Sequence, residues 1–526
     1  MSELPSGWAL SELQEVTEIS PKFSAELPED TLVHFVPMAA VAEDFGGIDV
    51  SQLRPLREVR KGYTSFAEGD VLFAKITPCM ENGKGALVPK LLHGQAFGST
   101  EFHVMRPSAA ISSEWLAHYL SQPDFRKVAR HNMTGTAGQL RVPTKWLQAV
   151  QLPIPPRAEQ TRIVEKLEAL LGDLDTAVAE LKAAQHKLAS LRQSLLKAAV
   201  DGALTAEWRA AHGKPQEAGA DLLQRILRER RARWETKQLA KFAAQGKTPP
   251  KGWQAKYPEP VAPDTTDLPQ LPEGWVWASL GQCFHVAVGA TPSRKEPGYW
   301  NGDVPWVSSG EVRFCRISST KESITQLGLE NSSTQINPRG SVLLGMIGEG
   351  RTRGQVAILD IEAANNQNCA AIWVSETELP PEYVYFWLWS RYEQTRKGSS
   401  GNNQPALNKS IVESIPLPLP PLAEQHAIIE QLDTALSACD TQQAAIDHAL
   451  QQAAAQRRNL LKTAFAGQLV PQDPTDEPAS ELLARIRAAK AQMPAAHGRK
   501  RAGANPAPAT NLRNTGTRSR RSKETG

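Results

Sequence analysis

LPIPPRAEQ, at Leu152–Gln160, returns 265 residues later as LPLPPLAEQ, at Leu417–Gln425. Ten of the sixteen positions from 152 to 167 are identical to their counterparts from 417 to 432. The likeness continues to LLKAAVDGAL and LLKTAFAGQL, which begin at Leu195 and Leu460. Two units are too few for a solenoid, so the repeat predicts internal two-fold pseudo-symmetry.

Each copy of the repeat is predicted to open one long helix. The proline pairs 155–156 and 420–421 fit the first position of a helix but not its interior. Glu159 and Glu424 then place a carboxylate near the positive start of the helix dipole. The helix that starts at Ala158 is expected to run to Val200, which is roughly 65 Å.

Hydrophobic residues recur at steps of four and three along both predicted helices, the spacing of a coiled-coil seam. Gly202 and Gly467 are the expected helix stops. An ordinary pair of core helices is the alternative, but length, register and repetition favour a coiled coil. The first seam is Ile163, Leu167, Leu170, Leu174, Ala177, Leu181, Ala184, Leu188, Leu191 and Leu195, and the second is Ile428, Leu432, Ala435, Cys439, Gln442, Ile446, Ala449, Ala453, Gln456 and Leu460.

The composition is that of a soluble chain with several domains. The 526 residues are 41% hydrophobic, which is ample for real cores. No signal sequence opens the chain and no run of eighteen apolar residues occurs, so we expect a cytoplasmic protein without a membrane span. The five scattered cysteines lack zinc spacing and predict free thiols. Net charge is only +3, and the basic end from Arg499 onward is typical of a disordered tail.

A globular module is predicted before each long helix, because LPSGW at Leu4–Trp8 returns as LPEGW at Leu271–Trp275. The order of predicted elements matches, while most residues differ, which favours two recognition modules of different specificity. The predicted strands and helix are 32–37, 70–76, 85–88, 101–105 and 114–130 in the first module, and 304–307, 341–347, 355–359, 370–374 and 382–396 in the second.

The segment between the repeats, 201–270, contains a charged helix predicted over Asp221–Lys241 and a Pro/Lys/Gln-rich linker over Gln245–Pro269. LLQRILRER at Leu222 is echoed by LLARIRAAK at Leu482, after the second long helix. The repeated apolar stripe favours docking of this helix over a solvated surface helix.

Motifs for catalysis are missing from the sequence. It has no G-x-x-x-x-G-K-[ST] phosphate loop, no G-x-S-x-G elbow and no H-E-x-x-H pair. No Pro-Pro pair lies in the polar and aromatic context of an amino-methyltransferase loop, and no carboxylate–lysine cluster indicates a nuclease. The sequence therefore predicts a chain that is not an enzyme and binds no metal.

Polar, glycine-rich loops are the candidate binding sites. Asn and Gln side chains can read adenine edges, Arg and Lys read guanine or hold phosphates, and Ser and Thr contact either. Gly, Asn and Ser are equally common in plain turns, so the chemistry alone leaves both interpretations open. The candidate DNA-binding residues are Lys61, Tyr63, Lys75, Thr77, Asn82, Lys84, Thr136, Gln139 and Arg141 in the first module, and Arg294, Ser308, Ser309, Glu311, Arg313, Arg351, Arg353, Asn366, Asn402, Asn403 and Gln404 in the second.

The repeat plan resembles the specificity (S) subunit of type I restriction–modification enzymes. The motifs that carry the resemblance are LPxGW at both module starts, LPIPPRAEQ and LPLPPLAEQ, and the helix ends AVDGALT and AFAGQLV. FAEGDVLFAKITPCMENGKG and YWNGDVPWVSSGEV also look like target-recognition sequences of that family. The resemblance covers nearly the whole chain except the linker and the basic tail.

The resemblance implies two mixed α/β target-recognition domains, each reading half of a split double-stranded DNA target. Two long helices would pack as an antiparallel coiled coil that sets the gap. Two methyltransferase (M) subunits would bring S-adenosylmethionine for adenine-N6 methylation, and restriction (R) subunits would bring ATP and Mg²⁺, so this chain would hold no cofactor. The expected domains are 1–154 and 271–419 for recognition, 155–202 and 420–467 for the spacer helices, 203–270 for the helical segment and linker, and 468–526 for a C-terminal helix and basic tail.

Two other classes of protein were compared with this interpretation. A fused or solitary DNA methyltransferase or nuclease is disfavoured by its missing motifs. A coiled-coil scaffold whose modules bind proteins would explain the helices but not the paired, divergent polar loops.

Overall fold

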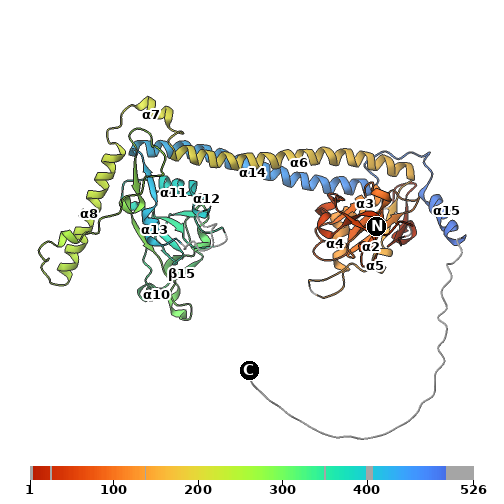
Figure 1. Cartoon of the computed structure of the whole chain (residues 1–526), viewed down its shortest axis with the longest axis horizontal. Coiled ribbons are helices and arrows are strands. Elements are labelled where there is room, and N and C mark those ends of the chain that lie inside the picture. The colour runs from red at the N-terminus through yellow and green to blue at the C-terminus, as the bar shows by residue number, and fades with distance from the viewer. Residues whose placement is uncertain (1–3, 24–25, 137, 349–350, 398–406, 493–526) are drawn as a thin grey trace, which may run out of the picture. The chain divides into compact units, whose positions relative to one another are not determined.

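The computed structural model describes residues 4–23, 26–136, 138–348, 351–397 and 407–492. It divides into two compact units, one within 1–173 and 455–526 and the other within 174–454 (Figure 1). Each unit contains one module together with one end of each of two long helices.

Two four-stranded sheets build the first module. The antiparallel sheet has the strand order β2-β9-β6-β7, and the mixed sheet has the order β4-β3-β8-β5. In the mixed sheet, β3 and β8 are the parallel pair. The elements are β1 (Ala9–Glu12), α1 (Leu13–Val16), β2 (Thr17–Ile19), β3 (Leu32–Val36), β4 (Leu53–Pro55), α2 (Leu56–Val59), β5 (Thr64–Ala67), β6 (Val71–Ala74), β7 (Gly85–Leu87), β8 (Gln95–Gly98), β9 (Phe102–Pro107), α3 (Ser113–Ser121), α4 (Pro123–His131), α5 (Thr144–Gln148) and β10 (Gln151–Ile154).

The second module shares most of this topology, but one sheet has gained a strand and the other has lost one. Its five-stranded sheet has the order β12-β19-β16-β17-β14, and its three-stranded sheet has the order β15-β13-β18, in which β13 and β18 are parallel. The elements are β11 (Val276–Ser279), α9 (Leu280–Cys283), β12 (His285–Val288), β13 (Trp300–Val307), β14 (Cys315–Ile317), β15 (Glu322–Ile324), α10 (Gln326–Glu330), β16 (Val342–Gly345), β17 (Val356–Leu359), β18 (Ala364–Asn365), β19 (Cys369–Trp373), α11 (Pro381–Ser390), α12 (Tyr392–Lys397), α13 (Lys409–Ser414) and β20 (Pro416–Leu419).

The predicted module strands are present, but both predicted module helices are broken. The helix expected over 114–130 is two helices, α3 and α4, which meet at Gln122 because Pro123 cannot lie inside a helix. The helix expected over 382–396 breaks at Arg391, between α11 and α12. The strands β6 and β16, from GDVLFAKI and GSVLLGMI, are fully buried and take the same place in their sheets.

Each module is closed by a two-stranded ribbon formed by the two repeated motifs. The strand after LPSGW, β1, pairs antiparallel with β10 of LPIPP, and β11 pairs with β20 in the same way. The Trp8 indole Nε1 donates to the Glu159 carboxylate over 3.0 Å, and Trp275 donates to Glu424 over 2.8 Å. The start of each module is therefore fixed to the first turn of its long helix.

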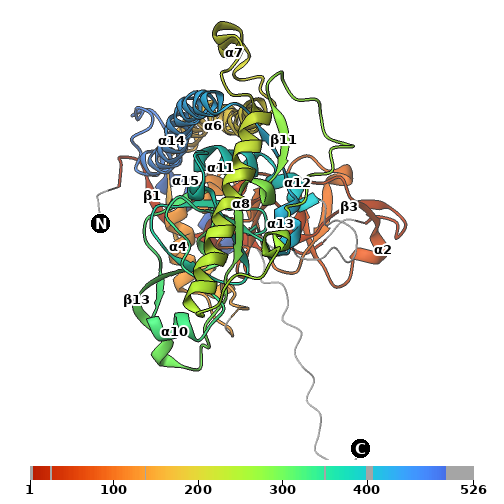
Figure 2. The same cartoon turned by 90° about the vertical axis from the view of Figure 1, so that its left-hand side faces the viewer.

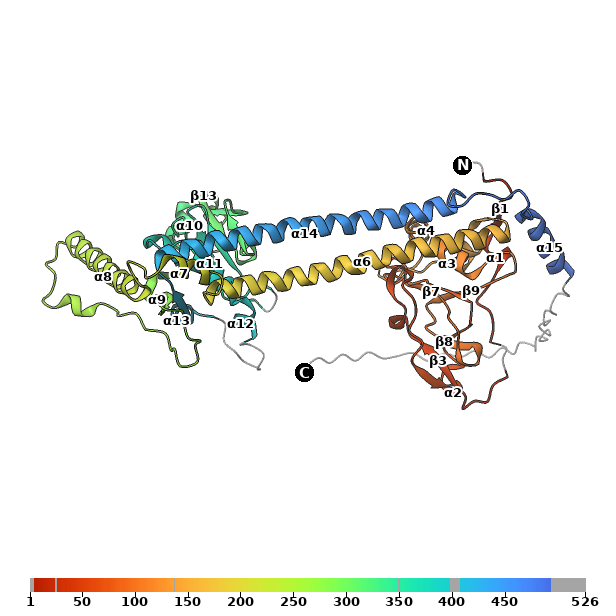
Figure 3. The same ribbon diagram turned by 90° about the horizontal axis from the view of Figure 1, so that it is seen from above.

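The long helices are α6 (Arg157–Val200) and α14 (Leu422–Phe465), which lie side by side and pack antiparallel (Figures 1 and 3). In the second unit, Gln185 Nε2 donates to Asp447 Oδ1 over 3.2 Å and Arg192 pairs with Asp440, so rising numbers on α6 meet falling numbers on α14. The predicted mixed α/β modules with two antiparallel long helices are confirmed. Both helices stop before a glycine with positive φ, Gly202 and Gly467, as predicted.

The interhelical seam differs from the predicted one at every second position through the middle of α6. Leu174, Leu181 and Leu195 are half-buried and Leu188 is buried, but Leu191 is 47% exposed and is not part of the seam. Val178, Gln185 and Arg192, each one residue later than predicted, alternate with those leucines. Ala177 and Ala184 are exposed.

The same displacement occurs on α14. Gln442 and Gln456 are exposed, whereas Gln443 and Arg457 are half-buried. The prediction followed apolar residues on α6 and carried that register to α14 by the repeat offset. An interface that holds polar pairs also admits Gln and Arg by their aliphatic stems. Of the remaining predicted seam residues, Ile163, Leu167, Ile428, Leu432, Cys439 and Ala453 are buried, and Leu170, Ala435, Ile446, Ala449 and Leu460 are half-buried.

The segment between the repeats is folded onto the second unit (Figure 2). It contains α7 (Ala206–His212) and α8 (Gly219–Ala244), and Leu222, Leu223 and Ile226 of α8 are buried in the core of that unit. Docking of this helix, favoured by its apolar stripe, is thereby confirmed. The expected linker also packs against α8, because Trp253 of the linker is stacked on Trp234 of that helix with ring centroids 5.6 Å apart.

The helix α15 (Ala479–Gln492) occupies the corresponding place in the first unit. Leu483 is buried, and Arg487 forms an ion pair with Glu15 over 2.8 Å. The echo between the two sequences after the long helices thus reflects one docking helix per unit.

We predict that Leu188→Ala destabilises the second unit by about 2–4 kcal/mol, because it opens a cavity in the seam. Leu191→Ala, one turn away on the exposed face, is the matched control and should change the free energy of unfolding by less than about 0.5 kcal/mol. Denaturant unfolding measures both. Equal losses would contradict the observed seam.

Candidate nucleic-acid interface

Two of the predicted loops in the first module come together beyond the end of β6. Ile76 and Arg141 form an isolated antiparallel bridge, and the Thr77 N–H donates to the Leu140 carbonyl over 3.0 Å. This pairing places residues 134–136 and 138–141 beside the residues that follow β6. Five predicted residues therefore share one pair of loops: Lys75, Thr77, Thr136, Gln139 and Arg141.

Arg141 is held by Glu101, a residue that sequence analysis did not select. The guanidinium Nη2 donates to Glu101 Oε1 over 2.8 Å and Nε donates to Oε2 over 3.0 Å. These hydrogen bonds lower the pKa of Glu101 below its ordinary value. His103 lies close by; burial lowers its pKa, and its Nε2 is 2.9 Å from the Val142 carbonyl oxygen. Arg141 is therefore oriented by the Glu101 carboxylate, while Thr136 and Gln139 remain exposed.

The side chains of Asn82 and Lys84 form hydrogen bonds with a nearby segment of the same module instead. Asn82 Nδ2 donates to Glu43 Oε1 over 2.7 Å, and Lys84 Nζ donates to the Met38 carbonyl over 3.1 Å. These contacts tie the turn after β6 to the loop that precedes β4. Asn82 and Lys84 therefore shape that turn.

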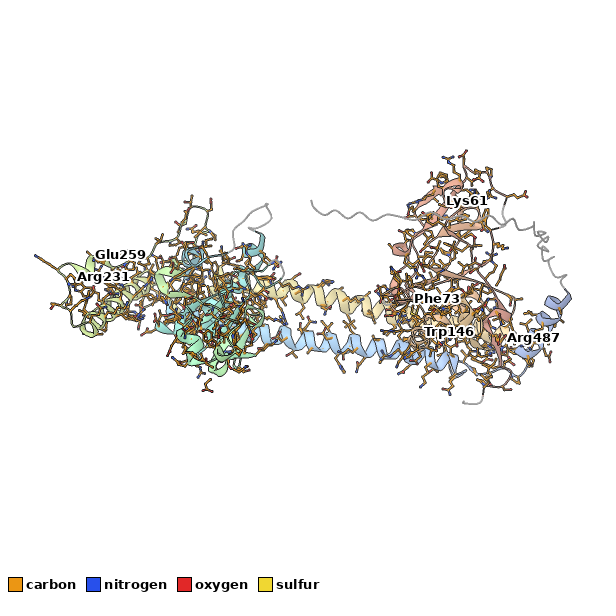
Figure 4. All side chains as sticks on the ribbon, turned by 90° about the horizontal axis from the view of Figure 1, so that it is seen from below. Lys61, Phe73, Trp146, Arg231, Glu259 and Arg487 are labelled. Carbon is orange, nitrogen blue, oxygen red and sulfur yellow. The ribbon has the colours of Figure 1, made fainter. Side chains whose placement is uncertain are left out.

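Lys61 and Tyr63 belong to the other sheet of the first module, between α2 and β5. Both are exposed, and the Tyr63 ring meets Phe35 edge-on with centroids 4.8 Å apart. Figure 4 shows Lys61 at one end of this module and Phe73 and Trp146 towards the other. The first-module candidates thus form at least two separate groups.

In the second module, the ends of the parallel strands β13 and β18 bring four predicted residues together. Asn366 Nδ2 donates to Ser309 Oγ over 3.4 Å, and Glu311 accepts from both Ser308 N and Ser308 Oγ over 2.9 Å. Asn366 is 7% exposed. Ser308, Glu311 and Asn366 therefore use much of their hydrogen-bonding capacity to shape this loop pair.

Arg294 lies against an aromatic pair on β13. Its guanidinium is 3.8 Å from the Trp300 ring centroid, and it forms two hydrogen bonds with Glu322. Trp300 meets Trp306 edge-on at 5.1 Å. The stack fixes a flat cation at the surface, the kind of group that binds a phosphate or a base face.

The other candidate arginines of the second module lie on two loops. Arg313 is exposed and donates from Nε to the Gly310 carbonyl over 2.6 Å. Arg351 is exposed and Arg353 half-buried, and the Arg351 carbonyl accepts from the Tyr392 hydroxyl over 2.9 Å. Asn402, Asn403 and Gln404 lie outside the described residues.

Gln367 and Thr291 were not selected from the sequence but adjoin these loops. Thr291 Oγ1 donates to Gln367 Oε1 over 2.6 Å, and Gln367 is exposed next to Asn366. The run of amides from 365 to 368 could have indicated Gln367. Thr291 carried no such signal, because only the fold brings it there.

Two further features are absent from the described ranges. No group of three or more His, Cys, Asp and Glu side chains among them is arranged to hold a metal ion. None of the helices in that part of the chain is long and apolar enough to cross a membrane.

Comparison with known proteins gives a family match over more than half of the chain. The model of the type I restriction modification DNA specificity domain matches residues 5–183 and again residues 272–452. The two matched segments contain the two modules and most of the long helices.

Curated relatives and a solved structure agree with this match. The EcoAI specificity subunit of Escherichia coli is 26% identical over 495 residues, covering 83% of this chain and 79% of the relative. The EcoEI specificity subunit of Escherichia coli is 26% identical over 498 residues with the same coverage. A chain from a structural study of complex assembly and conformational transition of the type I R-M system superposes with a TM-score of 0.63 at 21% identity, covering 89% of this chain and 100% of that one.

The twice-matched domain, two pseudo-symmetric modules and antiparallel helices lead to one conclusion. The chain belongs to the family of type I restriction–modification DNA specificity subunits, the non-catalytic members of those systems.

Proposed function

We propose that each module reads one half of a bipartite double-stranded DNA target and that α6 and α14 set the gap between the halves. The observation that carries this proposal is one topology used twice with different polar loops. Lys75, Gln139 and Arg141 supply side chains for one half-site, and Arg294, Arg313 and Arg351 for the other. Because the loops differ, the target is asymmetric.

The long helices also serve as the docking surface for two methyltransferase subunits in this proposal. Their outer faces are exposed, as Ala177, Ala184 and Gln442 illustrate, so they are open to a partner. S-adenosylmethionine belongs to those partners, and ATP and Mg²⁺ belong to the restriction subunits. The complex then methylates adenine N6 and restricts unmodified DNA, in the cytoplasm.

Residues 1–154 and 271–419 read DNA, and 155–202 and 420–467 form the spacer. Residues 203–270 and 468–526 complete the two units, the latter with a basic tail suited to nonspecific phosphate contacts.

One prediction concerns the gap. Repeating Lys182–Leu188 after Leu188, and Ser437–Gln443 after Gln443, lengthens both helices by about 10.5 Å at facing positions. The gap in the methylated motif should grow by about three base pairs, since DNA rises about 3.4 Å per base pair. Methylation mapping of the complex measures the gap. Both half-sites should stay the same; altered half-sites with an unchanged gap would refute the spacer role.

A second prediction separates the modules. Gln139→Ala should relax base preference in one half-site, and Arg313→Ala in the other, because a good bidentate base contact contributes about 1–3 kcal/mol of discrimination. Binding to a panel of single-base variants of the target, at fixed salt, measures this. The Leu191→Ala chain is the control. If these substitutions weakened the binding of protein partners and left DNA binding unchanged, the interpretation as a protein-binding scaffold would be favoured.

A further inference from the structure

The buried glutamates at the two helix starts have different surroundings. Glu159 and Glu424 are each 1% exposed, and each accepts a hydrogen bond from the tryptophan of its LPxGW motif. Glu424 Oε1 also accepts from Thr205 Oγ1 over 2.7 Å and from the Arg209 guanidinium. Glu159 Oε1 is buried and has no hydrogen-bond donor among the described residues.

The sequence explains this difference. Arg209 lies on α7, just after α6, and the repeat offset of 265 matches it to Pro474. The chain after α14 reads VPQDPTDEP, which is rich in proline and acid and supplies no cation at this place. Arg162 is the nearby cation, and it is engaged by Asp476 through two hydrogen bonds of 2.6 and 3.3 Å.

A cavity of about 340 Å³ adjoins Glu159 in the first unit, here called the Glu159 pocket. Its lining includes Gly7, Pro156, Asp473, Pro474 and Asp476. A water molecule takes about 30 Å³ in the liquid, so the pocket has room for a guanidinium group with several waters. Burial, and then the charge of Asp476, raise the pKa of Glu159.

We propose that the Glu159 pocket is a receptor for an arginine side chain, which takes the part that Arg209 plays in the second module. A guanidinium matches a carboxylate by its fork of N–H donors, and here it would neutralise a buried acid beside two aspartates. The helix α15 starts at the pocket wall, where Ala479 N donates to the Gly7 carbonyl over 2.9 Å. Beyond α15 the chain carries six arginines, Arg499, Arg501, Arg513, Arg518, Arg520 and Arg521, so it holds a tethered source.

The test uses the full chain with these six arginines replaced by glutamine, the tail-neutral chain. In the chain that keeps Glu159, replacing the six arginines should lower the melting temperature at low salt. In the chain that carries Glu159→Gln, the same replacement should leave the melting temperature unchanged. A labelled peptide of residues 497–523 should bind the tail-neutral chain and bind its Glu159→Gln variant about tenfold more weakly or worse. Glu424→Gln is the matched control, since its carboxylate already has Arg209.

The other outcomes either identify where the bound arginine comes from or overturn the proposal. If tail neutralisation changes nothing but the peptide still needs Glu159, the receptor stands and its arginine comes from another polypeptide. Peptide binding that is indifferent to Glu159→Gln, or equally lost in Glu424→Gln, overturns it. Pro474→Arg gives a second check: it should make stability independent of the tail, whereas Pro474→Ala should not. None of these results depends on DNA reading.

Discussion

A buried hydrogen bond between an indole and a carboxylate holds each half of this protein together. Trp8 and Glu159 are 151 residues apart in sequence, and Trp275 and Glu424 are 149 apart, yet each pair joins the start of a module to the start of a long helix. The closing ribbons β1–β10 and β11–β20 lie beside these bonds. These contacts join each module to the first turn of its own long helix.

The glycines after the helices complete this arrangement. A Cβ on Gly467 would lie 2.5 Å from the Pro5 side chain and 3.1 Å from the Trp8 ring, and a Cβ on Gly202 would meet Pro272 and Trp275 in the same way. The end of one long helix therefore packs against the opening motif of a module, where only glycine fits. Repeated LPxGW, PPxAEQ and helix-end motifs are thus three parts of one junction, used once in each unit.

Repetition made most of the fold predictable from the sequence, because motifs that fold together repeat together. The long helices, their stops at Gly202 and Gly467, and the matched strand order followed from it. The seam was harder, since Arg192 and Gln185 look like surface residues until Asp440 and Asp447 are placed opposite them. The loops were hardest: Glu101 and Thr291 gain their neighbours only through long-range pairing, and Glu311 and Asn366 proved to serve loop shape as well.

The central claim is that two different readers on one spacer define one asymmetric, gapped target. Mapping N6-methyladenine in cells that express the methyltransferase partner, with and without this chain, tests it most directly. The account predicts that one bipartite motif with unlike halves and a fixed gap is methylated on both strands only when the chain is present. An unchanged methylation pattern, or a motif that is contiguous and ungapped, would contradict it.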